Sequence, residues 1–457
     1  MKTIKLREIA EIVNGELFAD DPEIRVKGFS IDSRTIKTGE VFIAVKGNRF
    51  DGHDYIMEAI KNGAVAVIRK RNIDKVADHS VREILVNETL DALGKIAAGF
   101  RGRVFIPVVC VSGTNGKTTV KDMLAHILSG KYKVLKNKDS YNNIIGLSLT
   151  LFDLDSSHEV VVLELGTNYP GEIAKLAEIA RPYLAVITNV GDGHLENLKN
   201  REGVFLEKIS LLNSLPDDGM MFLNKDDSLL VKVASWGKRK RFFGRTEGSD
   251  FCISKINREE NGYSFCLNKK KYYIPVLGEH NIYNAAAAIA VSEYLGMEYV
   301  EIRERLKNVA LPKMRLEQIK IGDVLFINDA YNSNPSSFRC ALKVLKENSS
   351  RKKKVVVAGD MLELGEKSGE LHENIGKNIA EAKIDCFIAL GDSARFIAES
   401  AVSFGMKENT VFNVFDHDAA AKVLLGMSDS DTIVLLKGSR ASKMEEILKC
   451  FTTCYIH

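Results

Sequence analysis

The residues best suited to chemistry lie in one short stretch, residues 108–119 (VVCVSGTNGKTT). An apolar run typical of a buried strand leads into a glycine-rich turn, then a lysine and two threonines, then a helix-like segment over 120–128. Backbone N–H groups at such a helix start face an anion, and the ammonium group of Lys117 adds positive charge. The Thr118 hydroxyl can bind Mg²⁺. The stretch therefore predicts a phosphate-binding loop, the P-loop, for a nucleoside triphosphate.

The glycine spacing of this loop is irregular. The usual pattern is G-x-x-x-x-G-K-[ST], and its first position is Val111 here, with the glycine at Gly113 instead. An ordinary glycine turn is the alternative, but the strand before the turn and the helix after it favour the P-loop. The residues predicted to bind nucleotide here are Gly113, Thr114, Asn115, Gly116, Lys117, Thr118 and Thr119.

Two side chains follow neighbouring apolar strands of the same region. Glu164 ends the predicted strand 160–165, where a carboxylate can hold Mg²⁺ against the phosphates; a solvated glutamate at a strand end is the alternative. His194 lies in a glycine-rich loop just after the predicted strand 184–190. The carboxyl ends of parallel strands meet at one edge of a sheet, and a histidine at that edge suits a metal ion or a phosphate. A purely structural role fits His194 equally well.

Other polar residues carry little information by themselves. Lys208 on its own is typical of a surface helix, and Asn281 with Asn284 is typical of a helix cap. The loop at 329–335 (DAYNSNP) follows the predicted strand 324–327 and is rich in hydrogen-bonding side chains. Such a loop either binds a polar ligand or forms a plain turn.

Composition bounds the class of protein. The 457 residues suit about three domains. The net charge of +3 gives no sign of the strongly basic surface that binds nucleic acid. The 7 cysteines form no C-x-x-C pair, which argues against a zinc site or a disulfide framework and suits a reducing compartment. We expect no signal peptide and no membrane span, and therefore a cytoplasmic protein.

The chain divides into three predicted blocks. Residues 1–84 mix short strands with helices, residues 85–312 alternate strand and helix around the P-loop, and residues 313–457 repeat a strand that ends in glycine or another small residue. A patch at 241–277 looks antiparallel, and an alanine-rich helix covers 284–294. The predicted class is α/β, with a central P-loop ATPase-like parallel sheet, a small α/β N-terminal domain and a Rossmann-like C-terminal domain.

The order of these motifs resembles the Mur ligase family, the ATP-dependent amide ligases that build the peptidoglycan stem peptide. The resemblance covers essentially the whole chain. The family's order is matched by residues 113–118, Glu164, Thr188 and Asn189 with His194, Lys208, His280 and Asn281 with Asn284, Arg315, and Asp329. There are departures as well: Ser210 stands where relatives usually carry an acid after the lysine, and residues 198–200 replace a Phe-Gly-Ser-like turn.

Within the family, several segments are similar to the branch that adds D-alanyl-D-alanine. Residues 30–34 and 51–54 look like the UDP-binding domain that this branch shares with the ligases that add the third residue. Residues 329–335 match D-x-Y-N-x-N-P, and residues 359–365 and 437–440 are also similar to the D-alanyl-D-alanine branch. The resemblance implies a ligase that joins D-alanyl-D-alanine to UDP-N-acetylmuramoyl-tripeptide through an acyl phosphate, in peptidoglycan synthesis, with consequences for cell shape and cell division. The alternatives are a ligase that adds diaminopimelate or lysine as third residue, a folylpolyglutamate-type ligase, and a nucleotide switch without ligase activity.

The resemblance also implies residue roles. Lys117, His194 and Lys208 are the expected catalytic residues, with two Mg²⁺ ions held by Thr118, Glu164, His194 and a carbamylated Lys208. Asn281, Arg315 and Asp329 are expected at the nucleotide. Ser33 and Arg34 are expected at the UDP group, Asn142 and Asn143 at the muramoyl peptide, and Tyr331, Asn332 and Asn334 at D-alanyl-D-alanine. We expect a monomer that closes its domains before chemistry.

Overall fold

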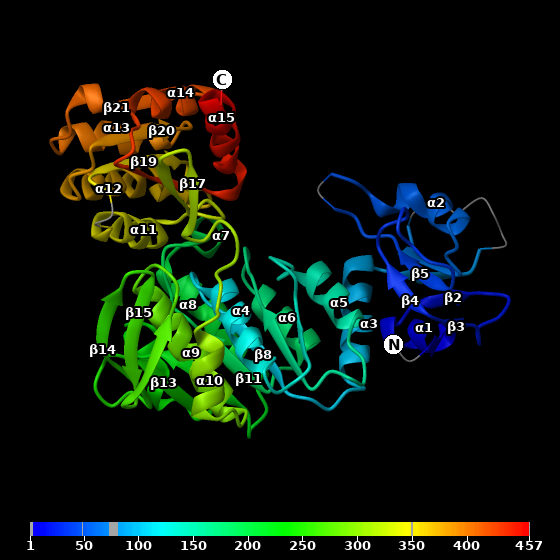
Figure 1. Ribbon diagram of the computed structural model, residues 1–457. Helices are drawn as coiled ribbons and strands as arrows, with labels where there is room; N and C mark the ends of the chain where they lie inside the picture. The colour runs from blue at the N-terminus through cyan, green and yellow to red at the C-terminus, as the bar shows by residue number, and fades with distance from the viewer. Residues whose placement is uncertain (1–2, 48, 73–80, 349–350, 457) are drawn as a thin grey trace.

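The computed structural model describes residues 3–47, 49–72, 81–348 and 351–456. Three α/β units follow one another along the chain, each with its own sheet (Figure 1). The N-terminal unit lies against the part of the central unit that carries α3 (Thr89–Arg101) and α5 (Ile144–Phe152), whereas the C-terminal unit lies over the other end (Figure 1). None of the helices in these ranges combines the length and the apolar character needed to cross a membrane.

The N-terminal unit is built on a five-stranded sheet in the order β2-β7-β6-β5-β4. Strands β4 to β7 are parallel, and β2 is antiparallel to β7. The elements of this unit are β1 (Ile4–Lys5), α1 (Leu6–Val13), β2 (Glu16–Phe18), β3 (Arg25–Val26), β4 (Gly28–Ser30), β5 (Glu40–Ile43), α2 (Ile56–Lys61), β6 (Ala66–Lys70) and β7 (Glu83–Val86). The predicted boundary after residue 84 falls inside β7, and the predicted domain ranges stay predictions.

The central unit is a nine-stranded sheet in the order β16-β15-β14-β13-β12-β11-β8-β10-β9. Strands β8 to β13 pair in parallel, and β14 to β16 form an antiparallel extension. The predicted antiparallel patch thus begins later than expected, because β13 pairs in parallel with both of its neighbours. The strands are β8 (Val108–Ser112), β9 (Val134–Lys136), β10 (Val160–Glu164), β11 (Leu184–Ile187), β12 (Met220–Asn224), β13 (Lys240–Gly244), β14 (Phe251–Glu259), β15 (Gly262–Leu267) and β16 (Lys270–Ile274).

Helices cover both faces of this sheet because its strands are apolar on both sides. Along β8, Val108 and Cys110 face one apolar core, whereas Val109 and Val111 face another. The helices are α3 (Thr89–Arg101), α4 (Lys117–Leu128), α5 (Ile144–Phe152), α6 (Glu172–Ala180), α7 (Leu195–Leu198), α8 (Arg201–Ile209), α9 (His280–Tyr294) and α10 (Tyr299–Leu306). Phe29 of β4 stacks on Phe152 of α5 with ring centroids 4.9 Å apart, so the N-terminal and central units share one core.

The C-terminal unit has a six-stranded sheet in the order β17-β18-β22-β19-β20-β21, parallel except at the β17 edge. Apolar cores fill both faces, as in a doubly wound fold. Its elements are β17 (Glu317–Ile321), β18 (Val324–Asn328), α11 (Pro335–Glu347), β19 (Lys353–Gly359), α12 (Ser368–Glu381), β20 (Cys386–Leu390), α13 (Ala394–Ser403), β21 (Val411–Val414), α14 (His417–Met427), β22 (Thr432–Lys437) and α15 (Glu445–Ile456). The predicted α/β class with three units is confirmed.

Candidate active site

The P-loop joins β8 to α4 in a conformation that needs its two glycines. Gly113 has φ +143° and Gly116 has φ +83°, a region that side chains with a Cβ rarely adopt. A Cβ on Gly113 would collide with the Thr188 hydroxyl, and one on Gly116 would collide with the Asn284 amide. The displaced glycine of the motif therefore has a steric reason, because the loop after β11 and helix α9 both pack directly on the P-loop.

The loop after β11 also fixes the backbone of the P-loop. Asn189 accepts from the Asn115 N–H at 2.9 Å through Oδ1 and donates to the Asn115 carbonyl at 3.0 Å through Nδ2. The Thr188 hydroxyl donates to the same carbonyl at 2.5 Å. These two residues belong to the matched family pattern, but their task as a scaffold for the P-loop was not predicted.

Lys117 is the first residue of α4, and its side chain bonds to the backbone of the P-loop. Its Nζ donates to the carbonyls of Gly113 at 2.9 Å and Thr114 at 3.1 Å. Burial lowers the pKa of Lys117, and the charge of Arg315 lowers it further, whereas the Glu164 carboxylate acts in the opposite direction. Lys117 therefore feels the negative charge of Glu164 and the positive charge of Arg315, which other elements contribute.

Glu164 ends β10 beside the P-loop and is buried, with 2% of its surface exposed. Its Oε1 accepts from Asn142 Nδ2 at 2.8 Å, and its Oε2 has no hydrogen-bond partner among the described residues. The side-chain amide of the fully buried Asn137 holds the backbone of Glu164. Its Oδ1 accepts from the Glu164 N–H at 2.9 Å, and its Nδ2 donates to the Glu164 carbonyl at 3.0 Å. A buried carboxylate oxygen without a donor suits a cation. Asn137 was missed because no local pattern marks it.

Lys208 lies on α8 and is 1% exposed. Its pKa falls well below the ordinary lysine value because of burial and the nearby charge of Lys117. The adjacent Glu207 carboxylate accepts from the N–H groups of Gly171 at 2.6 Å and Ile173 at 2.8 Å. Ser210, which replaces the expected acid, donates to the Glu207 carbonyl at 2.6 Å. The departure from the family pattern therefore leaves α8 intact, and Lys208 faces inward.

His194 precedes α7 in a left-handed backbone conformation, with φ +57°. Its Nδ1 lies 2.6 Å from Oε2 of Glu363, which comes from the C-terminal unit, and this close contact with His194 lowers the pKa of Glu363. The Glu363 carbonyl also accepts from the Glu196 N–H at 3.1 Å. A carboxylate on one ring nitrogen orients a histidine so that the other nitrogen is presented outward. The contribution of Glu363 was not predicted.

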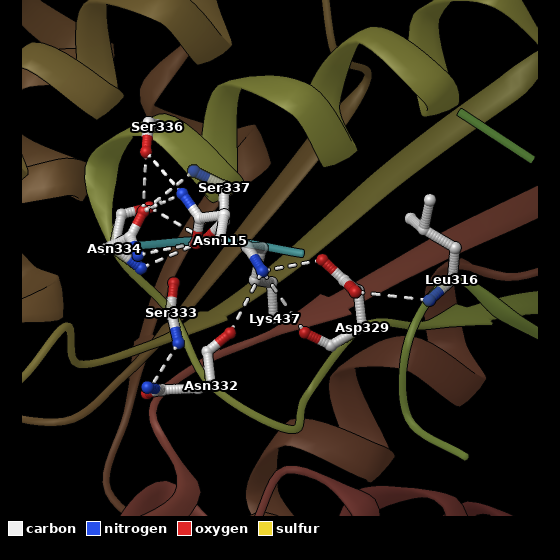
Figure 2. A network of polar contacts seen from close by, with 9 residues as sticks. All are labelled: Asn115, Leu316, Asp329, Asn332, Ser333, Asn334, Ser336, Ser337 and Lys437. Atoms are coloured by element: carbon white, nitrogen blue, oxygen red, sulfur yellow. Dashed lines mark hydrogen bonds and ion pairs between the residues drawn. The ribbon is translucent and has the colours of Figure 1, made fainter. Parts of the chain in front are cut away.

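The C-terminal unit brings a second set of polar groups to the same place. Lys437 ends β22 and is 1% exposed; its Nζ lies 2.6 Å from Asp329 Oδ2 and 3.2 Å from the Asn332 carbonyl (Figure 2). Asp329 Oδ1 accepts from the Leu316 N–H at 3.1 Å. The ion pair ties the ends of β18 and β22 together and fixes the start of the 329–335 loop. In the sequence, Lys437 stands out only as part of the 437–440 segment.

Arg315 crosses from the C-terminal unit to the P-loop. Its Nη2 donates to Thr118 Oγ1 at 2.8 Å, and its guanidinium group lies over the Tyr331 ring, 4.3 Å from the centroid. Arg315 Nε is buried without a partner in the described part of the chain. An arginine fixed in this way places a permanent positive charge beside the P-loop.

One cavity of about 1060 Å³ collects most of the predicted residues from both units. Its predicted lining residues are Thr114, Asn115, Gly116, Lys117, Thr118, Thr119, Asn142, Asn143, Glu164, His194, Asn281, Arg315, Asp329, Tyr331, Asn332 and Asn334. Gly113 and Lys208 are buried and do not line it. Asn281 is 2% exposed and bonds to the Leu277 carbonyl and to Asn284, at 2.7 and 2.8 Å.

Ser33 and Arg34 lie in the N-terminal unit and outside this cavity. The Ser33 hydroxyl donates to Glu58 Oε2 at 2.7 Å, and the Arg34 guanidinium binds both oxygens of Asp32, at 2.9 and 2.7 Å. Their expected role at a UDP group stays a prediction, and it requires a substrate long enough to reach from one unit to the next.

The described residues contain no group of three His, Cys, Asp or Glu side chains that could hold a metal ion. Of the predicted metal ligands, Thr118, Glu164 and His194 line the cavity, and they come from three separate elements. A metal bound there must therefore take several of its ligands from the substrate phosphates or from water, as Mg²⁺ commonly does in nucleotide sites.

Comparison with known proteins agrees with this geometry. Three family models match: Mur ligase family, catalytic domain (residues 25–101), Mur ligase middle domain (111–292), and Mur ligase, glutamate ligase domain (314–440). The UDP-N-acetylmuramoyl-tripeptide–D-alanyl-D-alanine ligase of Bacillus subtilis (strain 168) is 36% identical over 97% of each chain.

Solved structures agree as well. A crystal structure of MurF from Acinetobacter baumannii matches with a TM-score of 0.91 at 28% identity, over 99% of each chain. MurF ligase from Thermotoga maritima, solved in complex with ADP, matches with a TM-score of 0.84 at 30% identity, over 94% of this chain and 97% of that one. The chain therefore belongs to the Mur ligase family.

Proposed function

We propose that this protein is the ATP-dependent ligase that joins D-alanyl-D-alanine to UDP-N-acetylmuramoyl-tripeptide in peptidoglycan synthesis. The observation that carries the proposal is the single cavity in which the P-loop faces the 329–335 loop of the C-terminal unit. The name and 36% identity of the Bacillus subtilis relative support the choice of substrates. The T. maritima structure with ADP supports a nucleotide at the P-loop.

The reaction must first activate a carboxylate, which is a poor acyl donor. The terminal carboxylate of the tripeptide attacks the γ-phosphate of ATP, which yields an acyl phosphate and ADP. The amine of D-alanyl-D-alanine then attacks the acyl carbon, and the tetrahedral intermediate collapses to an amide and inorganic phosphate. Such transfers depend on alignment and charge neutralisation more than on covalent help from the protein.

The central unit supplies the charges for phosphoryl transfer. Lys117 and the N–H groups at the start of α4 hold the β- and γ-phosphates, and Arg315 adds a second positive charge from the C-terminal unit. Thr118 and Glu164 would hold one Mg²⁺, and His194 with a carbamylated Lys208 a second. When bound, these ions neutralise phosphate charge. The unpartnered, buried Oε2 of Glu164 supports this assignment.

The environment of Lys208 fits carbamylation. The amine must be neutral to add carbon dioxide, and burial beside Lys117 lowers its pKa in the required direction. The addition releases a proton and leaves an anion, which the positive charge of Lys117 would stabilise. The same charge would repel an ammonium group at that place, so carbamylation replaces repulsion between two buried cations with attraction.

The substrates are assigned to the remaining predicted residues. Asn142 and Asn143 would contact the muramoyl peptide, and Ser33 with Arg34 the UDP group. Asn281 and Asp329 would contact the nucleotide, and Tyr331 with Asn332 the dipeptide. Residues 1–84, 85–312 and 313–457 would then serve the UDP-sugar, ATP and the amine respectively. We propose that the protein acts as a monomer in the cytoplasm.

A panel of amine acceptors tests the proposal, with phosphate release as the readout. We expect release only when ATP, Mg²⁺, UDP-N-acetylmuramoyl-tripeptide and D-alanyl-D-alanine are all present. Release with UDP-N-acetylmuramoyl-dipeptide and diaminopimelate or lysine would instead identify the ligase that adds the third residue. ATP hydrolysis indifferent to both substrates would favour a nucleotide switch. The inactive control is Lys117→Ala.

A further inference from the structure

Asn334 is the N-cap of α11, and both polar atoms of its amide are bonded within the protein. Its Oδ1 accepts from the Ser337 N–H at 2.9 Å, as an N-cap does, and from the Ser336 hydroxyl at 2.9 Å. Its Nδ2 donates to Asn115 Oδ1 at 2.8 Å, and its Oδ1 accepts from Asn115 Nδ2 at 3.3 Å (Figure 2). Two amides from different units thus form a reciprocal pair.

The helix cap determines the orientation of both amides. A backbone N–H can only donate, so the Asn334 atom that faces Ser337 must be the oxygen. The Asn334 nitrogen then points to Asn115, which must present its own oxygen there. The Asn115 nitrogen in turn donates to the Ser336 hydroxyl at 2.7 Å. The pair has one consistent hydrogen-bond pattern, and it starts from the backbone of α11.

On the other side of the pair, Asn115 cannot move independently of the P-loop. Both its N–H and its carbonyl are bonded to Asn189, and its side chain projects toward α11. Gly191, in the loop after β11, is also close to α11, since a Cβ there would lie 3.1 Å from the Ser336 hydroxyl. The start of α11 therefore rests on the P-loop and on the loop that supports it.

We propose that Asn334 is a positioning residue, whose amide pair with Asn115 clamps the P-loop to the start of α11, and that it does not bind the dipeptide. This rests on the proposed function, because the clamp fixes the acceptor loop relative to the triphosphate. Asparagine suits both tasks at once. Serine caps a helix but is too short to reach Asn115, and aspartate caps a helix but has no N–H to donate.

A double-mutant cycle between the two residues tests the clamp. The variants are Asn334→Ser, Asn115→Ala and their combination, measured for kcat, for KM of D-alanyl-D-alanine and of ATP, and for thermal midpoint. We expect N334S to lower kcat about tenfold with the KM of the dipeptide unchanged, because positioning is lost and binding is not. The double variant should be no slower than N115A alone, since the same contact is removed twice.

Two further variants separate the clamp from folding. Asp416→Ser exchanges another N-cap of the same unit, on α14, where Asp416 accepts from the Ala419 N–H at 2.7 Å. It should leave kcat unchanged, and the fall in its thermal midpoint should show how much stability a cap exchange costs. If N334S is too unstable to assay, Asn334→Asp keeps the cap and removes the bond to Asn115 Oδ1, and it should show the same loss of kcat.

Three results would overturn the clamp. A rise in the KM of the dipeptide with kcat unchanged would make Asn334 a substrate residue, and kcat losses that multiply in the double variant would show that the two amides act separately. Wild-type kcat in N334D would show that the bond from Asn334 Nδ2 to Asn115 Oδ1 is dispensable. Failure of the proposed function is seen separately, in wild-type protein that releases no phosphate in response to D-alanyl-D-alanine.

Discussion

The two sides of the cavity use their polar groups differently. On the side of the central unit, Glu164 Oε2 has no partner in the described structure, and Lys208 is buried with a strongly lowered pKa. On the side of the C-terminal unit, Asp329 and Asn334 are already bonded to Lys437, Leu316 and Asn115. Glu164 thus keeps part of its charge unsatisfied until a ligand arrives, whereas Asp329 and Asn334 hold the shape of their own side.

The difference separates two kinds of contribution to one reaction. Charged groups held ready in a cavity stabilise the charge that develops during phosphoryl transfer, which is worth large factors in rate. Internally bonded groups position the second substrate and contribute through geometry. Substitutions on the central side should therefore remove chemistry. Those on the C-terminal side should mainly change stability or alignment, with the exception of Arg315, whose charge reaches the P-loop.

The largest effect is expected for Lys117→Ala. The ammonium group is the cation built into the P-loop, so its loss should lower kcat for phosphate release by about 100-fold or more. Steady-state phosphate release with all substrates at saturation measures it. The matched control is Lys422→Ala, which removes an exposed lysine of α14 paired with Asp418. A K117A variant as active as that control would contradict the assignment of the central side to charge stabilisation.

Lys208→Ala should be nearly as damaging. If the active form is a carbamate, the variant loses an anion, and kcat should fall by about 100-fold. A small carboxylate such as formate or acetate should restore part of the activity to K208A by occupying the vacated space. Lys208→Arg, which keeps a permanent positive charge, should stay inactive with or without the acid. Full activity in K208A would remove Lys208 from the reaction.

The central side was also the more predictable one. The P-loop and Glu164 were recognisable because strand, turn and helix signals are local, and because parallel strands end at one edge. Asn137, Glu207 and Glu363 were not, since each acts on a residue brought near only by the fold. Asn137 bonds to Glu164, 27 positions away, and Asn334 to Asn115, 219 positions away. A contact between single side chains at such separations leaves no periodicity or motif in the sequence.

On the C-terminal side, Lys437→Met should affect stability more than charge recognition. Lys437 is 1% exposed and lies 2.6 Å from Asp329. Among the described residues, the variant leaves the Asp329 carboxylate with the Leu316 N–H as its remaining donor. Loss of one partner of a buried pair costs about 3 kcal/mol in free energy of unfolding. Urea unfolding, followed by circular dichroism, measures it. An unfolding free energy equal to wild type would show that this side is not held by its ion pair.

The smallest effect is expected for Arg34→Ala in the N-terminal unit. The Arg34 side chain is 78% exposed and is bound to Asp32, which offsets part of its charge. If Arg34 also contacts the diphosphate of the UDP group, its loss removes one charge-assisted hydrogen bond, and the KM of UDP-N-acetylmuramoyl-tripeptide should rise about tenfold. The kcat, the KM of ATP and the thermal midpoint should not change.

Arg25→Ala, which removes another exposed arginine of the same unit, is the control and should leave the KM of the UDP substrate at the wild-type value. A fall in kcat for R34A as large as that for K117A would break the comparison, because an exposed and internally paired charge would then contribute as much to turnover as the cation of the P-loop. A KM rise confined to the UDP substrate would support the comparison. Binding energy used far from the reacting carboxylate changes affinity, whereas charge placed at the phosphates changes rate.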